Sequence, residues 1–445
     1  MNFLNPQSFF GWISGRLYAA IALLAVTTNL CAKESKPPPP EPDGPLTLAH
    51  AVALSLSNNP SLCAYGYDMR AAEAQIIRSA YLPNPQIGFE VENLPGSGSR
   101  SGADATESTL RLSQVIELGG KRTRRLDEAR LSGGLAAWDY EARRIAVLAD
   151  TTRRFIEVAA GQERLVLALE ARTLAEAELE VVTERVQAAR NSVVEQKKAE
   201  IAVIRAGLDE EHASHTLLAA RKALAAMWGS EDAAFASARA DFFTHRQPEA
   251  FGSLMARIGQ NPDLARFALE AQLRDCQLRL ARTRGISDVT VTAGLRQFAD
   301  ENEWAGVFGV SLPLPFFDRG QAEVYEALQM QGKTEALGHA IRVQLASQLF
   351  SIYQELKHTV TELDAMAKDI LPAAREVLQT TEEGYKQGRF SYLELADARR
   401  SLIELRHANL DTTLAYHLSL AEIDRMLGTA ALAPQSPAPA VKKKR

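Results

Sequence analysis

The sequence predicts a mixed α+β membrane protein in which very long coiled-coil helices alternate with short strands. Three observations predict this fold class. No proline occurs between Pro95 and Pro248, and much of that interval consists of strong helix formers. Four segments of about ten residues or fewer alternate apolar and polar side chains. The same order of elements occurs twice, at a spacing of about 200 residues, which predicts two internal repeats.

The N-terminus predicts a secretory signal. Arg16 supplies a positive charge, and residues 17–26 form an apolar run of about ten residues, which fits a signal and is too short to cross a bilayer as a helix. We expect residues 1–32 to be the signal peptide, with cleavage after Ala32. A proline-rich linker is expected over 33–45.

Cys31 is a candidate for lipidation, although residues 28–30 match poorly the small-residue context that lipoprotein processing prefers. Cys63 and Cys276 would be permitted to form a disulfide in an exported protein. We favour the alternative, in which each of the two is a separate thiol packed between helices.

Composition argues against several classes of protein. With 46% hydrophobic residues, 24% charged residues and a net charge of −5, the chain gives no sign of a nucleic-acid partner. Beyond the signal, no stretch is apolar over the roughly 18 residues that a transmembrane helix needs. We therefore expect any membrane crossing to be made by β-strands. Because no phosphate loop or catalytic motif stands out, we expect neither an enzyme nor a cofactor.

The two repeats are predicted over 46–230 and 249–428, joined by a linker at 231–248 and followed by a disordered tail at 429–445. Short motifs mark equivalent points of the two copies. These pairs are Asn59-Pro60 with Asn261-Pro262, Gly119-Gly120 with Arg319-Gly320, Gln187 with Gln387, and Trp228-Gly229 with Leu427-Gly428.

Each repeat contains one very long predicted helix, at about 120–190 and about 319–386. Apolar residues recur there at alternating steps of four and three, which is the pattern of a coiled-coil seam. At a rise of roughly 1.5 Å per residue, about 70 residues would extend near 100 Å. Pro372 is expected to bend the second long helix.

Four strands are predicted, two in each repeat, each with one apolar and one polar face. This alternation fits strands placed between lipid and water, and a soluble hairpin with one buried face is the alternative. Four strands cannot close a barrel, so membrane-spanning strands would require several subunits to share one barrel. The predicted strands are 86–92, 108–116, 289–298 and 304–314.

These features together resemble the TolC-type outer-membrane efflux proteins, over about residues 46–428. The run Gln-Val-Ile-Glu-Leu-Gly-Gly-Lys-Arg at 114–122 is similar to the strand-to-helix junction of the heavy-metal, CzcC-like branch. The motifs Leu-Pro-Ala-Ala at 371–374 and Gly-Tyr-Lys-Gln-Gly at 384–388 are similar to that branch's second hairpin.

The resemblance implies a homotrimer with a twelve-stranded β-barrel in outer-membrane lipid and a tunnel of twelve helices in the periplasm. It implies two protein partners, a periplasmic adaptor (membrane fusion) protein and an inner-membrane RND-type pump, and a passive exit channel for heavy-metal cations. A multidrug or type I secretion channel of the same fold is the alternative. A second alternative, a periplasmic coiled-coil scaffold without a barrel, would leave the alternating strands unexplained.

The resemblance also places the adaptor-facing end and the gate at the tips of the two helical hairpins. Gly388 is expected to reverse the chain, and Ser391 with Glu394 forms a capping-box pattern. The first tip has Ala189 where a glycine would be expected. The predicted adaptor-facing residues are Gln187, Asn191, Ser192, Gly388 and Ser391.

The predicted gate combines acidic residues with arginines that could pair with them when the pore is closed. A ring of acids from three subunits would attract cations. Capping alone would also explain Glu394, and a solvated helix face would explain Asp397. His212 and His215 have a spacing compatible with a metal, but a solvated face is the simpler interpretation. The predicted gate residues are Glu195, Glu394, Asp397, Arg190, Arg389 and Tyr385.

Overall fold

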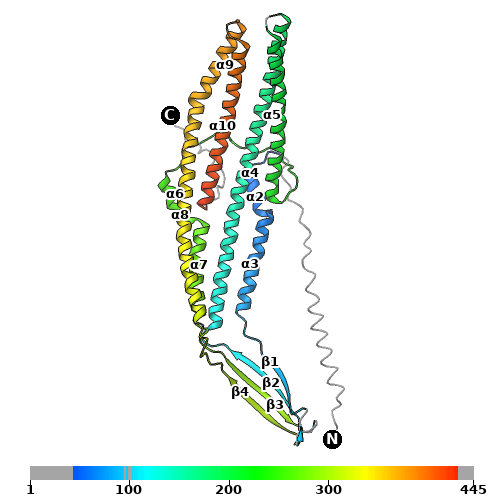
Figure 1. Ribbon diagram of the computed structural model, residues 1–445, viewed down its shortest axis with the longest axis vertical. Coiled ribbons are helices and arrows are strands. Elements are labelled where there is room, and N and C mark those ends of the chain that lie inside the picture. Colours follow the sequence, from blue (N-terminus) through cyan, green and yellow to red (C-terminus); the bar gives the residue numbers. More distant parts are fainter. Residues whose placement is uncertain (1–43, 95–96, 99–102, 104, 190, 429–445) are drawn as a thin grey trace, which may run out of the picture. The chain divides into compact units, whose positions relative to one another are not determined.

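The computed structural model describes residues 44–94, 97–98, 103, 105–189 and 191–428 (Figure 1). The predicted signal peptide, most of the proline-rich linker, Cys31, Arg190 and the predicted tail lie outside the described residues. Within 44–428, the two repeats run in the same order of short helix, longer helix, strand, strand, long helix and returning helix.

The first repeat contains α2 (Leu48–Asn58), α3 (Pro60–Ser79), β1 (Gln86–Glu92), β2 (Glu107–Ile116), α4 (Lys121–Gln187), α5 (Val193–Ala225) and η3 (Ala226–Trp228). The second contains α6 (Phe251–Arg257), η4 (Ile258–Gln260), α7 (Pro262–Ala281), β3 (Val289–Phe298), β4 (Glu303–Ser311), α8 (Gln321–Ala365), η5 (Met366–Ile370), α9 (Leu371–Lys386) and α10 (Tyr392–Met426). In the described chain, no helix is both long and apolar enough to span a bilayer.

Equivalent asparagines begin the second helix of each repeat. The Asn59 side chain accepts hydrogen bonds from the first-turn N–H groups of α3, and Asn261 does the same for α7. Each amide also donates across the repeat, to the Met227 carbonyl from Asn59 and to the Met426 carbonyl from Asn261, both at 2.7 Å. One side chain thus caps a helix and ties it to the end of its own repeat.

The strands form one antiparallel sheet in the order β1-β2-β3-β4 (Figure 1). The register places side chains of one kind in rows across all four strands. One such row is Ile87, Leu112, Ala293 and Phe308, and the next is Phe89, Leu110, Leu295 and Gly306. Because alternate residues of a strand face opposite sides, these rows form one apolar face.

The opposite face of the sheet is polar and carries ion pairs between neighbouring strands. Arg111 pairs with Glu90 at 2.6 Å. Arg296 pairs with Glu92 at 2.8 Å and with Glu107 at 2.6 Å. A sheet with one apolar and one charged face fits a boundary between lipid and water.

The fourth strand ends earlier than the sequence predicted. We expected it to reach Leu314, but the ladder ends at Ser311. Pro313 and Pro315 explain the difference, because a proline has no N–H with which to extend a ladder of hydrogen bonds. The chain beyond Ser311 is irregular until α8 begins at Gln321.

The two long helices differ in continuity. The first, α4, runs unbroken for 67 residues and ends at Gln187, short of the predicted residue 190. The second was predicted as one helix over 319–386, but the five-residue π-turn η5 separates α8 from α9. Pro372 occupies the first turn of α9. Since proline cannot donate to the carbonyl four residues earlier, a wider turn before it accommodates the missing hydrogen bond.

The segment between Trp228 and Phe251 crosses both repeats. The Arg239 N–H of this segment donates to the Leu46 carbonyl of the first repeat at 2.8 Å. The Gln162 side chain of α4 donates to the Ala238 carbonyl of the segment at 2.9 Å. Further along, the Arg246 N–H donates to the Tyr416 hydroxyl of α10 at 2.9 Å. These bonds fasten the helices of the two repeats to one another at the level of this segment.

Candidate functional site

Each helical hairpin reverses through a short tip built in the same way. At the first tip, the Ser192 hydroxyl accepts from Glu195 N–H at 3.3 Å, while Glu195 accepts from Ser192 N–H at 3.0 Å. At the second tip, Ser391 and Glu394 make the same exchange at 3.3 and 2.6 Å. Both are capping boxes, which satisfy N–H groups at the start of the returning helix.

The tips also share one left-handed residue, although they differ in its identity. Gly388 has φ of 73°, and Ala189 has φ of 54°. Aligning these two residues also aligns the capping boxes, at an offset of 199 residues. The predicted pairing of Gln187 with Gln387 is therefore wrong by one position, since the offset matches Gln187, which ends α4, with Lys386, which ends α9.

Tyr385 connects the two hairpins of the chain. Its side chain is buried, and the Arg185 guanidinium of α4 lies 4.1 Å from the centre of its ring. Arg185 also donates to the Tyr385 carbonyl at 3.2 Å, and the Asn191 amide donates to the Tyr385 hydroxyl at 3.2 Å. Tyr385 therefore contacts the neighbouring hairpin of its own chain.

Arg399 forms a second connection between the hairpins, which sequence reasoning missed. From α10, its guanidinium donates to Glu178 of α4 at 3.1 Å and to Glu382 of α9 at 2.8 Å. Burial opposes its charge, but the hydrogen bonds to Glu382 and the charge of Glu178 raise the pKa of Arg399. One arginine thus holds three helices by charge-assisted hydrogen bonds.

An apolar cluster lies between these two connections. Tyr392, the first residue of α10, is buried with Leu395 against Val182 and Ala199 of the first hairpin. Burial, and then the nearby Glu178 carboxylate, raise the pKa of Tyr392 to about 12. Tyr392, Leu395 and Arg399 are spaced three and four apart, so they share one helix face. The presence of an arginine on this otherwise apolar helix face is the sequence signal that could have identified Arg399.

The predicted acidic residues lie at the tips but are not equivalent. Glu394 is exposed, and its pKa is lowered by hydrogen bonds from the Ser391 N–H and hydroxyl. Asp397, one turn further along α10, is also exposed. The exposed Arg389 side chain donates to the Gln387 amide oxygen of its own tip. Within the chain, the Arg389 guanidinium therefore binds an amide oxygen. Arg190, the other arginine predicted to pair with these acids, lies outside the described residues.

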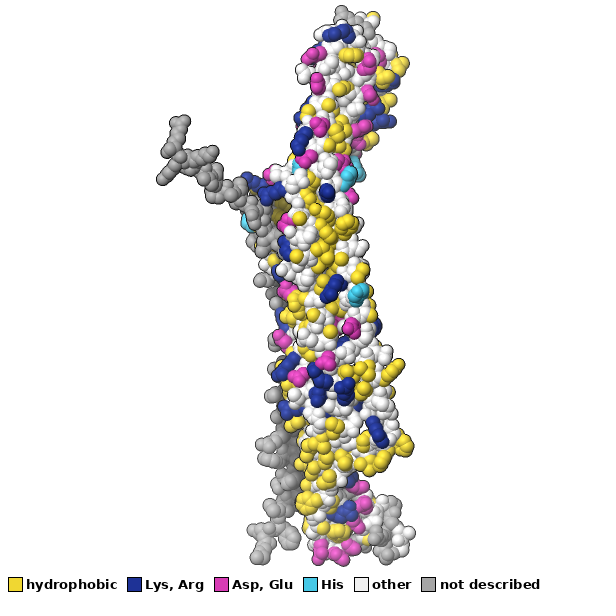
Figure 2. Space-filling view, turned by 90° about the vertical axis from the view of Figure 1, so that its left-hand side faces the viewer, with side chains coloured by type: hydrophobic (Ala, Val, Ile, Leu, Met, Phe, Trp, Pro, Cys, Tyr) yellow, Lys and Arg dark blue, Asp and Glu magenta, His cyan; other side chains and the backbone are white. Residues whose placement is uncertain are grey.

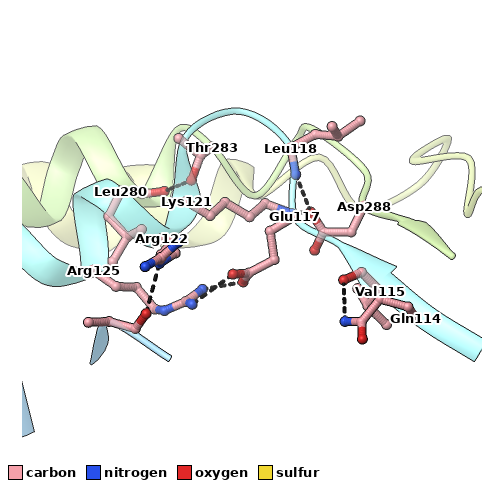
Figure 3. Close-up of polar contacts among 11 residues, drawn as sticks. Gln114, Val115, Glu117, Leu118, Lys121, Arg122, Arg125, Leu280, Thr283 and Asp288 are labelled. Carbon is pink, nitrogen blue, oxygen red and sulfur yellow. Dashed lines mark hydrogen bonds and ion pairs between the residues drawn. The ribbon is translucent and has the colours of Figure 1, made fainter. Parts of the chain in front are cut away.

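The junction of β2 with α4 is an ionic clamp (Figure 3). Glu117 binds Arg125 through both carboxylate oxygens, and this hydrogen bonding lowers the pKa of Glu117. Asp288, just before β3, accepts from Leu118 N–H at 3.0 Å and from the Lys121 ammonium at 2.8 Å. Burial opposes the charge of Asp288, yet these bonds hold its pKa below the ordinary value. The clamp joins the first repeat to the second.

Two glycines in left-handed conformation lead into α4 from this clamp. Gly119 has φ of 71°, and Gly120 has φ of 69°. A Cβ on Gly119 would come within 2.7 Å of the Ile286 side chain. Both glycines of the junction motif therefore adopt a backbone conformation that favours glycine, and a side chain at Gly119 would also collide with Ile286.

The cysteines and histidines singled out by the sequence lie apart. Cys63 and Cys276 are both free thiols, as we favoured, but only Cys276 is buried; Cys63 is exposed, so the prediction that it packs between helices is wrong. Burial raises the pKa of Cys276. His212 and His215 are exposed on α5. Among the described residues, no group of three or more His, Cys, Asp or Glu side chains is arranged to hold a metal ion.

Known proteins resemble the chain over most of its length. A family model described as outer membrane efflux protein matches residues 51–230 and 256–429. The cobalt-zinc-cadmium resistance protein CzcC of Cupriavidus metallidurans is 29% identical, over 88% of this chain and 92% of that protein. The nickel-cobalt-cadmium resistance protein NccC of Alcaligenes xylosoxydans xylosoxydans is 25% identical, over 73% of this chain and 71% of that protein.

Solved structures share the fold at lower sequence identity. The outer membrane protein VceC from Vibrio cholerae superposes with a TM-score of 0.72 at 18% identity, covering 86% of this chain and 96% of that one. With two matched family segments that coincide with the two repeats, the chain belongs to the outer membrane efflux protein family.

Proposed function

We propose that this chain is the outer-membrane exit duct for heavy-metal cations, working as a homotrimer with a periplasmic adaptor and an inner-membrane RND-type pump. The observation that carries the metal assignment is the similarity to CzcC, a cobalt-zinc-cadmium resistance protein, over 88% of the chain. NccC, which is named for nickel, cobalt and cadmium, supports the same cargo class.

The one-sided sheet supports the homotrimer. In a single chain, β1 and β4 each have one unpaired edge, and the apolar side chains Ile87 and Phe308 are 78% and 84% exposed. Unpaired edges and exposed apolar rows are unfavourable unless other strands and lipid cover them. Copies of the same sheet, paired edge to edge around a polar lumen, satisfy both requirements.

The two connections at the tips act as a latch that holds the duct closed at rest. We call Tyr385 with Arg185 and Asn191, and Arg399 with Glu178 and Glu382, the tip latch. Each part joins the second hairpin to the first, so separating the hairpins breaks both. Most of these contacts are hydrogen bonds and ion pairs, whose polar groups can exchange their partners for water when the gate opens.

The acids at the tips, of which Glu394 and Asp397 are exposed and Glu195 is partly buried, give the entrance its preference for cations. Glu394, Asp397 and Glu195, repeated in three subunits, place negative charge around one axis. Arg389 and Arg190 are the arginines that we expect to moderate this charge in the closed state. The adaptor contacts the tip surface that includes Gln187, Asn191, Ser192, Gly388 and Ser391.

Growth of a strain lacking the gene tests the cargo. The strain would be grown across graded zinc, cobalt, cadmium, nickel, copper and silver, with drugs and dyes in parallel. We expect selective sensitivity to divalent metals, restored by the intact gene. Sensitivity to drugs without sensitivity to metals would reject the metal cargo and assign the duct to multidrug export.

Reversal potentials in planar bilayers test the acidic entrance. Glu394→Gln keeps the capping box, because glutamine replaces glutamate in that motif, and removes only the charge. Combined with Asp397→Asn, it should reduce the preference for cations over anions. Lys386→Gln removes one positive charge from the same tip, against two negative charges in the double variant, and should shift the preference by a smaller amount in the opposite direction. Unchanged reversal potentials in the acidic double variant would reject this role.

A further inference from the structure

The apolar surface of the sheet continues past the last hydrogen-bonded residue of β4. On the strand, Phe308 and Val310 are 84% and 75% exposed. Beyond Ser311, exposed apolar side chains continue at every second position, with Leu314 at 62% and Phe316 at 69%, followed by Phe317 at 95%. We call residues 312–317 the elbow.

Three carbonyls of the elbow accept hydrogen bonds from within the elbow or from the turn that follows it. Phe316 N–H donates to the Leu314 carbonyl at 2.9 Å. The Arg319 side chain donates to the Pro315 carbonyl at 3.3 Å, and Gln321 donates to the Phe317 carbonyl at 3.1 Å. The two prolines of the elbow carry no N–H. An irregular segment arranged in this way suits a surrounding that offers few hydrogen bonds.

Exposed arginines lie next to the apolar elbow in the sequence and at the neighbouring junction. They are Arg319, directly after the elbow, Arg282 after α7, and Arg122 at the start of α4. Figure 2 shows hydrophobic side chains gathered where the strands meet the helices, with lysine and arginine side chains beside them. An apolar band bordered by basic side chains is complementary to acyl chains bordered by phosphates.

We propose that the elbow is a lipid anchor that seats in the inner leaflet of the outer membrane. Its ligand is a glycerophospholipid, with acyl chains against Leu314, Phe316 and Phe317 and phosphate groups beside the arginines. A neighbouring subunit paired with β4 would use the backbone groups of the strand edge, whereas these side chains extend the apolar face. The anchor thus fixes the depth at which the sheet enters the bilayer.

The distance along the chain agrees with this placement. From Trp304, 64% exposed near the start of β4, to Phe316 is 12 residues. At roughly 3.3 Å per residue this is an extended path of up to about 40 Å, which a tilt of about 45° reduces to near 28 Å. Aromatic residues thus lie at both ends of an apolar stretch that matches the hydrocarbon core.

Tryptophan quenching by brominated lipid tests the anchor in the full-length protein. In a Trp304→Phe background, Phe317→Trp would be reconstituted in phosphatidylcholine vesicles with and without bromine on the acyl chains. We expect the fluorescence contributed by residue 317 to be lost to about the same extent as that of native Trp304. Leu337→Trp, an exposed apolar position on α8, should not be quenched and is the matched control.

The charged border is tested with a minor fraction of brominated phosphatidylglycerol in the same vesicles. Quenching at residue 317 should exceed that caused by brominated phosphatidylcholine at equal mole fraction. In the Arg122→Gln, Arg282→Gln double variant, quenching by the two lipids should become equal. Equal quenching in the parent would overturn the preference of the arginines for an anionic headgroup, whose phosphate has no choline cation beside it. An unquenched residue 317 in a correctly assembled, heat-modifiable oligomer would overturn the lipid anchor itself.

Discussion

The two hairpin tips share a capping box and a left-handed residue, yet only one of them inserts aromatic side chains into its neighbour. At the first tip, Val193 begins the returning helix and is 62% exposed. Its counterpart at the second tip, Tyr392, is 5% exposed and packs against the first hairpin. The repeated devices build the turn, and the residues that differ between repeats build the tip latch.

The supporting helices differ in the same direction. The helix that leads to the first tip is the unbroken α4. The helix that leads to the second tip is α9, which begins directly after a π-turn. A π-turn within a helix is a frequent site of adjustment. We infer that the second hairpin is the one that moves when the duct opens, and that the first is the support against which it is held.

The largest expected effect comes from Arg399, which has no arginine counterpart in the first hairpin, where Glu200 occupies the equivalent position. Arg399→Ala leaves Glu178 and Glu382 close together and without their shared cation. Removing one partner of a mostly buried ion pair costs about 3 kcal/mol. Hydrogen exchange of α9 and α10 amides should show local opening easier by this amount. Arg400→Ala, an exposed neighbour, is the control, and equal exchange in the two variants would reject the effect.

High pH should weaken the packing of the second tip against the first hairpin. In the unfolded chain a tyrosine titrates near about 10, whereas Tyr392 in the fold has a pKa of about 12. Below pH 10 both states are protonated. Between about 10 and 12 only the unfolded state loses its proton, so the tip loses roughly 2–3 kcal/mol as pH rises. Difference absorbance of tyrosinate between the parent and Tyr392→Phe should titrate near 12, and a midpoint near 10 would contradict the burial.

Exchanging the two left-handed residues should lower the local stability of the second tip and raise that of the first. A Cβ at Gly388 would meet no atom within 4 Å, so Gly388→Ala introduces backbone strain alone. A left-handed non-glycine residue costs about 1 kcal/mol. Gly388→Ala should weaken its tip by about that much, and Ala189→Gly should strengthen the other. Amide exchange at each tip measures both, and changes of the same sign would contradict the comparison.

The smallest expected effect separates capping from charge at Glu394. Glu394→Ala removes the reciprocal bond to Ser391 and should cost about 0.5–1 kcal/mol in local stability. Glu394→Gln should cost less than half of that. A similar loss in both variants, measured by exchange of the first-turn amides of α10, would show that the charge is what stabilises the turn.

Local patterns in the sequence were sufficient for the strands, apart from the end of β4, and for the second capping box. Alternation over 86–92 and 289–298 corresponds to β1 and β3, and Ser391 with Glu394 forms the expected exchange of hydrogen bonds. These features depend on residues close together in the chain. Pro372 predicts an interruption of the second long helix but not its form as the π-turn η5, because Pro372 fits equally a bent helix and the first turn of a new one.

The tip latch could not be derived from the sequence for a different reason. Arg399 and Glu178 are separated by 221 positions, so their contact depends on the register between α4 and α10. Tyr385 was recognised as a tip residue, but its burial against Arg185 depends on how the hairpins pack. Long-range register is set by the whole length of the helices, which no short motif encodes.

Single-channel conductance of the reconstituted oligomer tests the tip latch most directly. We predict a low conductance for the parent protein and for Arg400→Ala, and a several-fold higher conductance for Arg399→Ala combined with Tyr385→Ala. Arg399→Lys should lie between them, because lysine keeps the charge but not the geometry that binds two carboxylates. An equal conductance in all four proteins would contradict a gate held closed between the two hairpins.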